Sequence, residues 1–570
     1  MSVYAVGLLI SIIVYLAVGS YAGRKVKHLE DYFVAGRNAP TLLIVGTLVA
    51  SLMSTNAFMG ETGLAYSGYP TVIIILTAVN VIGYTAGGLY FGRFLRRSRA
   101  LTVAEYFGQR FISRRVQVVA GITIVLGCTG YLVMVTQGTA TIIHEVTGLP
   151  FTGTLFVAWA GYTLFTLYSG SRGVVLTDTM MFLLFATVAF LGLAFIVEDA
   201  GGWFAAIKGL AAFEPKPGII SWHGVNGPDA TWKTPAESLT YAIILGIAWG
   251  IVVAVSPWQA SRYLMARNEH TVIRSATITA GVVMVLYLVL MLSGAAVNLI
   301  NPDIDPAQEN MVWAAMNVMP TFVGVLLMSG ILAAGLSSAS TFLSLVGFSA
   351  SNDIAPPKST DDQVRLKMSR RAMFIISLAA LTIAYLLPEG KLFWITYFAG
   401  TLFASSWGPV AFMSVWSSRI TEAGAFWGII AGLLGNVVTN ALALLHIVDL
   451  PVILDPILVG VALSYVTVEL VSLKTTVSEE EHALRERLHQ VPESEIDPEK
   501  LRRTLLWPKI LIASGVLLSI LMLLFYVAPY REATAGNATG EVLMSLGVGL
   551  SMVVAGALAW WGTARSYRVT

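Results

Sequence analysis

Residues Ala50–Tyr69 have the sequence ASLMSTNAFMGETGLAYSGY, in which an apolar segment is interrupted by polar and small residues. Hydroxyl and amide side chains at Ser54–Asn56 precede a second group, Gly60–Gly63, which contains a glutamate and two glycines. Polar groups are costly inside a lipid bilayer, so such a cluster is a candidate functional site. The run predicts a membrane helix that breaks near its middle and frees backbone carbonyls to bind a cation. A continuous, kinked helix that packs through small residues explains the same pattern.

The composition places this segment in a membrane. The chain has 570 residues, of which 56% are apolar and 12% carry a formal charge, whereas a typical soluble domain is about 25% charged. This balance excludes a nucleic-acid binder, a secreted disulfide scaffold and a disordered regulator. The single cysteine, Cys128, can form neither an internal disulfide nor a thiolate metal site. We therefore expect an all-helical, polytopic membrane protein.

Fifteen stretches of the sequence are apolar enough to be membrane spans. A helix needs about 20 apolar residues to cross about 30 Å of hydrocarbon. The stretches lie near residues 3–22, 40–67, 69–96, 115–147, 150–170, 172–198, 238–266, 273–300, 318–350, 371–388, 390–416, 423–447, 451–472, 509–528 and 541–563.

A second interruption is predicted in span seven, which contains Gly250 and Pro257. An ordinary proline kink explains span seven alone, but breaks five spans apart are what an inverted repeat predicts. The resulting division is a leading span and loop (1–39), a first repeat of five spans (40–198), an external loop (199–237), a second repeat of five spans (238–416), two additional spans (417–472), a cytoplasmic connector (473–508) and two last spans with a short tail (509–570).

The basic residues predict the orientation, because cytoplasmic loops are enriched in lysine and arginine. They cluster after spans one, three, seven and nine and at the chain end, which share one side if every span crosses. The loops 199–237 and 301–317 on the other side hold few cations. We therefore expect a multi-pass protein of the cell membrane with its N-terminus outside and its C-terminus in the cytoplasm. The first and last clusters are Arg24, Lys25 and Lys27, and Arg565 and Arg568.

Span nine carries hydroxyl groups on one face. Ala334, Ser337, Ser338 and Thr341 have the i, i+3, i+4, i+7 spacing of one helix face, and Ser340 lies beside it. Hydroxyl and carbonyl oxygens suit an alkali ion. The same small residues are also routine where membrane helices contact each other.

Span six contains an aspartate, Asp178, which is six residues past Arg172 and therefore about 9 Å along a helix. A carboxylate at this depth costs at least ~2.5 kcal/mol unless it is compensated. An ion-binding or proton-binding role explains Asp178. Pairing with a neighbouring arginine, or a protonated structural acid, explains it as well.

With these residues in view, the chain resembles the sodium:solute symporter family, which includes bacterial proline, sialic acid and galactose carriers and the animal sodium–glucose transporters. The resemblance covers spans one to twelve and rests on the order and spacing of several motifs. These are EDYFVAGR at 30–37, the segment of span two, TVAEYFGQRF at 102–111, Thr177-Asp178, SRYLMA at 261–266, AAGLSSAST at 333–341 and WSSRITEAGAFWGIIAG at 416–432.

The resemblance implies one or two sodium ions as coupling ions and a solute site beside the helix breaks. The main sodium site would use the carbonyls of Ala50 and Met53 with Ala334, Ser337 and Ser338. A possible second sodium would be held by Asp178, Ser337, Ser340 and Thr341. The solute would contact Ser54, Thr55, Asn56, Ala57, Ser256 and Trp258, the last of which would form an inner aromatic gate.

Four departures from the family pattern bear on the solute. Leu52 stands where the proline carrier has an acid, and Ala57 where the galactose carrier has a sugar-binding glutamine. Met181 replaces a frequent glutamine, and Pro257 a frequently polar residue. These changes argue against a hexose and against a close copy of the proline site.

The expected function is therefore sodium-coupled import of a small organic solute, such as an amino acid or a monocarboxylate, by alternating access. We expect no enzymatic activity, no nucleic-acid partner, and a monomer or weak oligomer in the lipid bilayer. One alternative is a proton-coupled carrier that uses Asp178. Another is a membrane sensor built on the same fold, although no kinase-like domain follows the last span.

Overall fold

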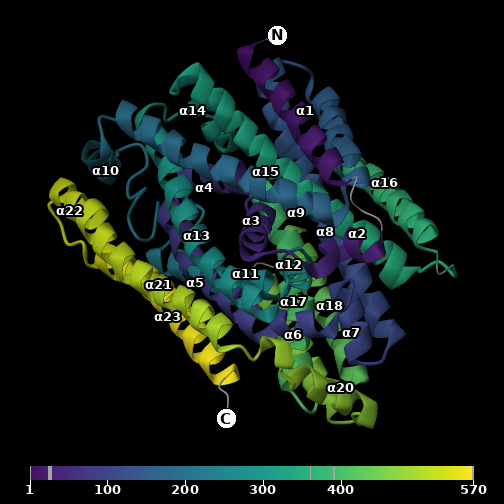
Figure 1. Ribbon diagram of the computed structural model, residues 1–570. Coiled ribbons are helices and arrows are strands. Elements are labelled where there is room, and N and C mark those ends of the chain that lie inside the picture. Colours follow the sequence, from purple (N-terminus) through teal and green to yellow (C-terminus); the bar gives the residue numbers. More distant parts are fainter. Residues whose placement is uncertain are drawn as a thin grey trace.

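The computed structural model of the protein is a bundle of helices (Figure 1). It describes residues 2–23, 28–359, 361–388, 392–445, 447–448 and 450–567, without the side chains of 20, 22–23, 29, 168–172 and 452. Across these ranges the only β-type pairing is an isolated bridge between Ala39 and Ala266. Arg24, Lys25, Lys27 and Arg568, which sequence reasoning used for the orientation, lie outside the described residues.

Most predicted spans correspond to long apolar helices. The described residues contain ten helices that are long and apolar enough to cross a membrane, or eleven if the bent pair Thr41–Leu52 and Asn56–Tyr66 is one span. Three shorter apolar segments, Val3–Gly19, Phe151–Leu167 and Pro456–Ser472, and the helix α17 (Leu392–Trp416) coincide with the four remaining predicted spans. The all-helical polytopic fold is confirmed, while the crossing of these last four stays a prediction.

Helix α9 (Phe151–Asp199) covers two of the predicted spans, with helical residues throughout. Its first half runs parallel to α1 (Val3–Gly23) and α15 (Thr321–Phe348), whereas its second half runs antiparallel to α15. The chain therefore reverses its direction within α9, as two spans require. The contact between α1 and the first half of α9 is Gly19–Phe165, while Ser2, just before α1, bonds to Val146 at the end of α8, shortly before α9 begins. The other contacts are Gly7–Val325 and Ser11–Ser329 between α1 and α15, and Val188–Gly330 and Asp178–Ser337 between the second half of α9 and α15.

Both predicted interruptions are present. Span two consists of α3 (Thr41–Leu52) and, after a break of three residues, the π-helical turn η2 (Asn56–Glu61) with α4 (Thr62–Tyr66); the two parts are bent by 55°. A continuous kinked helix is therefore wrong for this span. Span seven consists of α11 (Pro235–Val255) and α12 (Pro257–Met265), separated at Ser256, whose ψ of 147° is not helical.

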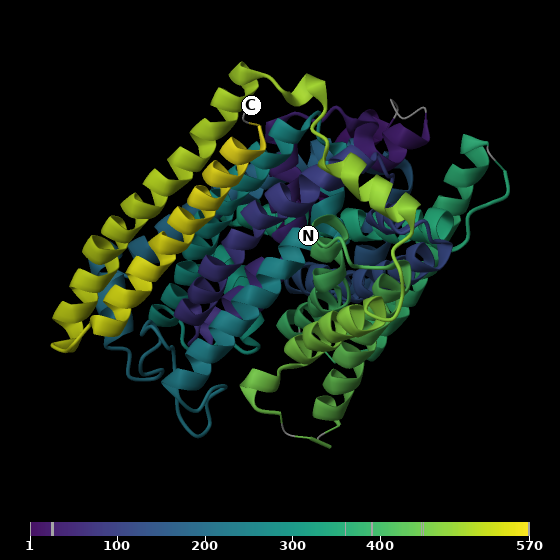
Figure 2. The same cartoon turned by 90° about the horizontal axis from the view of Figure 1, so that it is seen from below.

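The broken helices lie at the centre of the bundle. α3, α11 and α12 are surrounded by longer helices, and α21 (Pro498–Met522) and α23 (Thr539–Ser566) form an antiparallel pair along one side (Figures 1 and 2). The remaining helices are α2 (Leu29–Val34), α5 (Pro70–Gly87), α6 (Arg93–Ser98), α7 (Val103–Arg110), α8 (Arg114–Thr147), α10 (Trp203–Ala211), α13 (Glu269–Ala296), α14 (Asn310–Asn317), α16 (Asp362–Leu386), α18 (Glu422–Leu444), α19 (Pro456–Ser472), α20 (Glu479–His489) and α22 (Ala528–Thr534).

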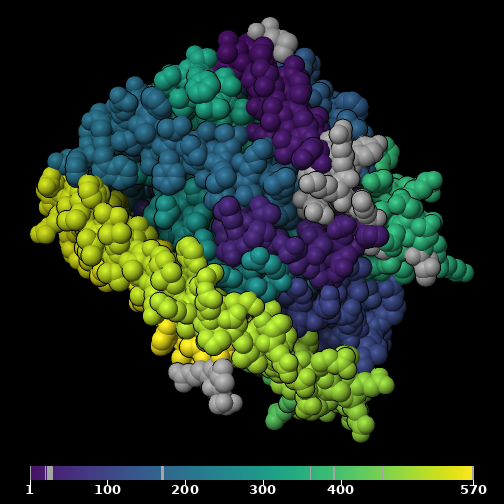
Figure 3. Space-filling model, in the orientation of Figure 1, coloured from purple at the N-terminus to yellow at the C-terminus, as the bar shows by residue number. Residues whose placement is uncertain are grey.

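The connector between α19 and α21 packs against one end of the bundle. Its helix α20 begins at Ser478, whose side chain accepts from the Glu481 N–H while Glu481 bonds back to the Ser478 N–H, a capping box that fixes the helix start. Arg97 of α6 donates to the carbonyl of Leu488 at 2.6 Å. In the space-filling view, the connector and α21 form a continuous yellow-green band along the lower edge of the molecule (Figure 3).

Candidate functional site

The backbone hydrogen bonds change register at the end of α3. In a regular helix the carbonyl of Ala50 would accept from the N–H of Ser54, and that of Met53 from Ala57. The Ser54 N–H instead donates to Leu52 at 2.9 Å, and the Ala57 N–H donates to Ser54 at 3.1 Å. The two carbonyls predicted to bind sodium are therefore released from the helical ladder.

The hydroxyl face of α15 lies directly against this break. The Ser338 hydroxyl donates to the Ala50 carbonyl at 3.4 Å. Ala334, Ser337 and Met53 are each fully shielded from solvent. The structure thus brings the two halves of the predicted main sodium site together at the contact between Ala50 and Ser338.

Asp178 is fully buried and accepts hydrogen bonds from several helices. Its Oδ1 accepts from the Ser337 hydroxyl of α15 at 2.6 Å, and its Oδ2 accepts from the Thr47 hydroxyl of α3 at 2.5 Å. The Ser340 hydroxyl donates to the Ser337 carbonyl at 2.9 Å. Asp178 therefore links α9 to both parts of the predicted sodium region.

A cation of the protein itself occupies the space between the ligands predicted for a second sodium. Nη2 of Arg262, on the half-helix α12, lies 3.5 Å from Oδ2 of Asp178 and also donates to the Thr341 hydroxyl. Pairing of Asp178 with an arginine was one explanation of its sequence position, and this pairing is observed. A second sodium between Asp178 and Thr341 would require Arg262 to move away.

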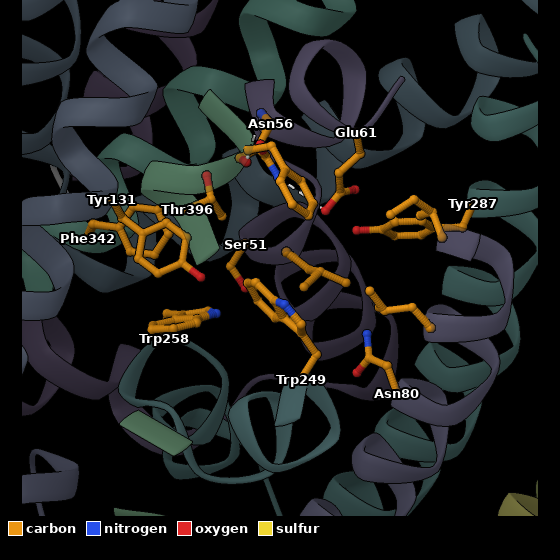
Figure 4. A pocket seen from close by; sticks show the side chains of 15 residues that line it. Ser51, Asn56, Glu61, Asn80, Tyr131, Trp249, Trp258, Tyr287, Phe342 and Thr396 are labelled. Carbon is orange, nitrogen blue, oxygen red and sulfur yellow. Dashed lines mark hydrogen bonds between the residues drawn. The ribbon is translucent and has the colours of Figure 1, made fainter. Parts of the chain in front are cut away.

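A small cavity of about 20 Å³ lies where the two broken helices meet, which is room for about one water molecule. Figure 4 shows its polar and aromatic walls. Three of the residues predicted to contact solute, Ser54, Asn56 and Trp258, line it. The other three, Thr55, Ala57 and Ser256, are buried behind the wall; the Thr55 hydroxyl faces Met134 of α8 at 3.5 Å.

Aromatic side chains close one side of this cavity. The Trp258 ring lies 4.7 Å from the Tyr131 ring and 5.2 Å from the Phe403 ring, between centroids. Tyr131 is in turn stacked on Phe342 at 4.6 Å. Trp258 is 1% exposed, so it forms a closed contact at the position where the resemblance places an inner aromatic gate.

Two residues of this site were not singled out from the sequence. Glu61 lines the cavity from η2, where its Oε1 accepts from the Asn56 amide at 3.1 Å; its only sequence signal is that it is the sole acid in 40–67. Arg262 lies within the motif SRYLMA, but its partner Asp178 is 84 residues away, so spacing alone could not reveal the pair.

A bundle with two broken helices, freed carbonyls and a central cavity defines a secondary transporter. Residues 32–432, over half of the chain, match the sodium:solute symporter family. The chain belongs to this family, and it is a multi-pass, sodium-coupled solute symporter rather than an enzyme.

Known relatives support the same assignment. The chain is 24% identical over 446 residues to the sodium/pantothenate symporter of Escherichia coli (strain K12), covering 76% of this chain and 89% of that protein. It is 27% identical over 454 residues to the sodium/proline symporter of Haemophilus influenzae, covering 73% of this chain and 84% of the relative.

Solved structures show the same fold. A substrate-bound, outward-open Na⁺-coupled sialic acid symporter superposes with a TM-score of 0.70 at 18% identity, covering 84% of this chain and 99% of that one. A nucleobase-cation-symport-1 family transporter in a closed conformation gives a TM-score of 0.50 at 11% identity, over 80% and 98% of the two chains.

Proposed function

We propose that this symporter imports a small organic solute, such as an amino acid or a monocarboxylate, across the cell membrane by alternating access. The observation that carries the proposal is the release of the Ala50 and Met53 carbonyls beside Ser338. Sodium bound to these oxygens with Ala334 and Ser337 would hold α3 against α15. Because the cavity is lined from both sides of the same break, sodium binding would also set its shape.

Sodium entry supplies enough energy for accumulation. Each sodium gains about 2.3 kcal/mol per 100 mV of membrane potential, and about 1.4 kcal/mol corresponds to a tenfold gradient. Coupling requires that sodium bind the outward-open state more tightly, since an ion that binds all states equally shifts no equilibrium. Loss of sodium to the cytoplasm would then loosen α3 from α15 and release the solute.

We propose one sodium while Arg262 contacts Asp178. The carboxylate is then already neutralised by an internal cation. A second sodium at Asp178, Ser337, Ser340 and Thr341 would bind in a state in which Arg262 has moved. For the solute, we propose direct contacts from Ser54, Asn56 and Trp258, with Thr55, Ala57 and Ser256 shaping the broken backbone.

Sodium binding to the purified, full-length protein tests this function without knowledge of the solute. We expect sodium, but not potassium at equal ionic strength, to raise the unfolding temperature of the wild type. Ser338→Ala should abolish this shift, and in vesicles it should abolish sodium-stimulated uptake. Ser344→Ala on the same helix is the matched control, because its buried hydroxyl makes no hydrogen bond in the described structure. A normal sodium shift in Ser338→Ala would refute the site.

A further inference from the structure

Glu61 is a carboxylate that neither proposed sodium site uses. One oxygen accepts from the Asn56 amide at 3.1 Å. The other, Oε2, is shielded from solvent and has no hydrogen-bond partner among the described residues. The Tyr287 hydroxyl points toward the carboxylate from α13 and is positioned to donate to it (Figure 4).

Glu61 also differs from Asp178 in its charge environment. Asp178 has Arg262 as a partner, whereas Glu61 forms no ion pair with any basic side chain in the described ranges. A buried charge without a partner is expensive. The described side chains around the cavity therefore supply Glu61 with no compensating cation.

The walls around Glu61 indicate what kind of cation fits. Six of the fifteen lining residues are aromatic, and aromatic faces attract organic cations at about 0.5–2 kcal/mol each. A bare alkali ion would want several oxygen ligands instead, as at the break of α3. The aromatic lining residues are Tyr131, Trp249, Trp258, Tyr287, Phe342 and Phe393.

Several polar atoms of the cavity wall are buried without a hydrogen-bond partner in the part of the chain that the structure describes: three acceptor oxygens and one hydroxyl, that of Tyr131. Besides Oε2 of Glu61, the amide oxygens of Asn56 and Asn80 are buried without a hydrogen-bond partner in the described structure. Both asparagines line the cavity, on η2 and α5. A ligand that donates N–H bonds would satisfy acceptors of this kind, since buried polar groups left unpaired cost free energy.

We propose that the transported solute carries a protonated amine, which binds the Glu61 carboxylate inside this aromatic and amide-lined cavity. The class includes amino acids and simple amines, and it excludes monocarboxylates and neutral solutes. This inference rests on the proposed function and narrows its solute class.

Matched ligand pairs test the inference in thermal unfolding of the full-length protein. Each amine is compared with the isostere in which carbon replaces the charged nitrogen: alanine with isobutyrate, and proline with cyclopentanecarboxylate. The remaining common amino acids and linear amines complete the panel. In sodium we expect at least one amine to stabilise the wild type and its carbon isostere to give no shift. Equal shifts within the pairs, or no shift from any amine, would overturn the inference.

Variants of Glu61 assign the effect to the carboxylate. Glu61→Gln should weaken amine binding at least about thirtyfold, as expected for a buried charge pair, and should keep the shift caused by sodium alone. Glu198→Gln, on an exposed end of α9, is the control. Loss of the sodium shift in Glu61→Gln would assign the carboxylate to the ion and overturn the inference. If Glu61→Gln fails to fold, the comparison of each amine with its carbon isostere in the wild type still tests the inference.

The two proposals fail in different ways. If isobutyrate or pantothenate stabilises the protein in sodium and amines have no advantage, a protonated-amine solute is contradicted, while sodium coupling is still supported. If an amine raises the unfolding temperature equally in sodium and in potassium, and its isostere does not, the amine site is supported and the sodium coupling is contradicted.

Discussion

Asp178 and Arg262 show how single residues connect the moving parts of this transporter. Asp178 belongs to α9, and its partners come from α3, α12 and α15. Because α3 and α12 are halves of the two broken helices, a change at either break must alter the surroundings of this one carboxylate. The pair is therefore both a structural link and a place where ion binding can be sensed.

Removing the Asp178 carboxylate should destabilise the protein, because the Arg262 charge is then buried without a partner. Asp178→Asn leaves Arg262 without its ion-pair partner, and breaking a buried pair costs about 3–5 kcal/mol. We expect a clear fall in the unfolding temperature, and a partial recovery when Arg262→Met is added, because the orphaned charge is then gone. An unchanged unfolding temperature in Asp178→Asn would show that the pair contributes nothing to the resting state.

The sequence predicts some of these residues better than others. The hydroxyls of α15 follow from helical spacing, and Asp178 from the cost of a charge in a membrane. Neither rule identifies Arg262, because its position near Asp178 depends on how α12 packs after the break at Ser256. The role proposed for Glu61 likewise depends on the cavity, whose other lining residues include side chains from eight further helices.

At the scale of elements, α5 and α11 pack with almost no space between their backbones. A Cβ at Gly83 would lie 2.1 Å from the carbonyl oxygen of Gly250. Small residues let membrane helices approach this closely. The part of span seven that precedes its break is thereby packed tightly against span three.

This close approach predicts a difference between two glycine substitutions. Gly83→Ala should destabilise the protein by about 1–3 kcal/mol, the usual cost of overpacking. Gly153→Ala is the control, since a Cβ there meets nothing within 4 Å. Thermal unfolding of both variants checks the prediction, and equal unfolding temperatures would contradict it.

The half-helix α4 is held at its end by a lysine from the loop between α10 and α11. Nζ of Lys216 donates to the Tyr66 carbonyl at 2.9 Å and to Asn298 at 2.6 Å, and it lies 3.9 Å from the centre of the Tyr66 ring. Burial lowers the pKa of Lys216 to about 8, an effect that Asp303 partly offsets.

This contact should tighten as the pH rises. Because burial lowers the pKa of Lys216 to about 8, the packed state favours the neutral amine, whereas a Lys216 released to solvent would keep its proton up to about pH 10. We expect a cysteine placed at Asn80, in a Cys128→Ser background, to become less accessible to an impermeant thiol reagent, relative to the same cysteine in Lys216→Arg, from about pH 8 to about pH 10. Lys216→Arg keeps the charge and corrects for the reactivity of the thiol itself. The same rise in both proteins would exclude a role for Lys216.

At the scale of the whole molecule, composition and span length were sufficient to predict an all-helical membrane protein. Composition and span length do not predict which spans pack against each other. The reversal within α9, for example, is visible only from its contacts with α1 and α15. Hydropathy reports the burial of a segment in lipid or protein, and it carries no information about its neighbours.

The proposed orientation can be tested directly, because the chain has a single cysteine. In a Cys128→Ser background, a cysteine at exposed Asp229 should react with an impermeant reagent on intact cells. A cysteine at exposed Glu480 in α20 should react only after permeabilisation. The reverse pattern would invert the topology, and reaction of both on intact cells would remove one crossing between them.

Arg262 also makes the protein itself responsive to voltage. Its guanidinium is a full charge held inside the membrane-spanning bundle on a half-helix, opposite a fixed negative charge on α9. Any tilt of α12 that separates the two moves charge through the electric field of the membrane, at up to about 2.3 kcal/mol per 100 mV for a complete crossing. The membrane potential then acts on the empty carrier as well as on sodium, and a transient current should accompany its reorientation even when no ion is carried.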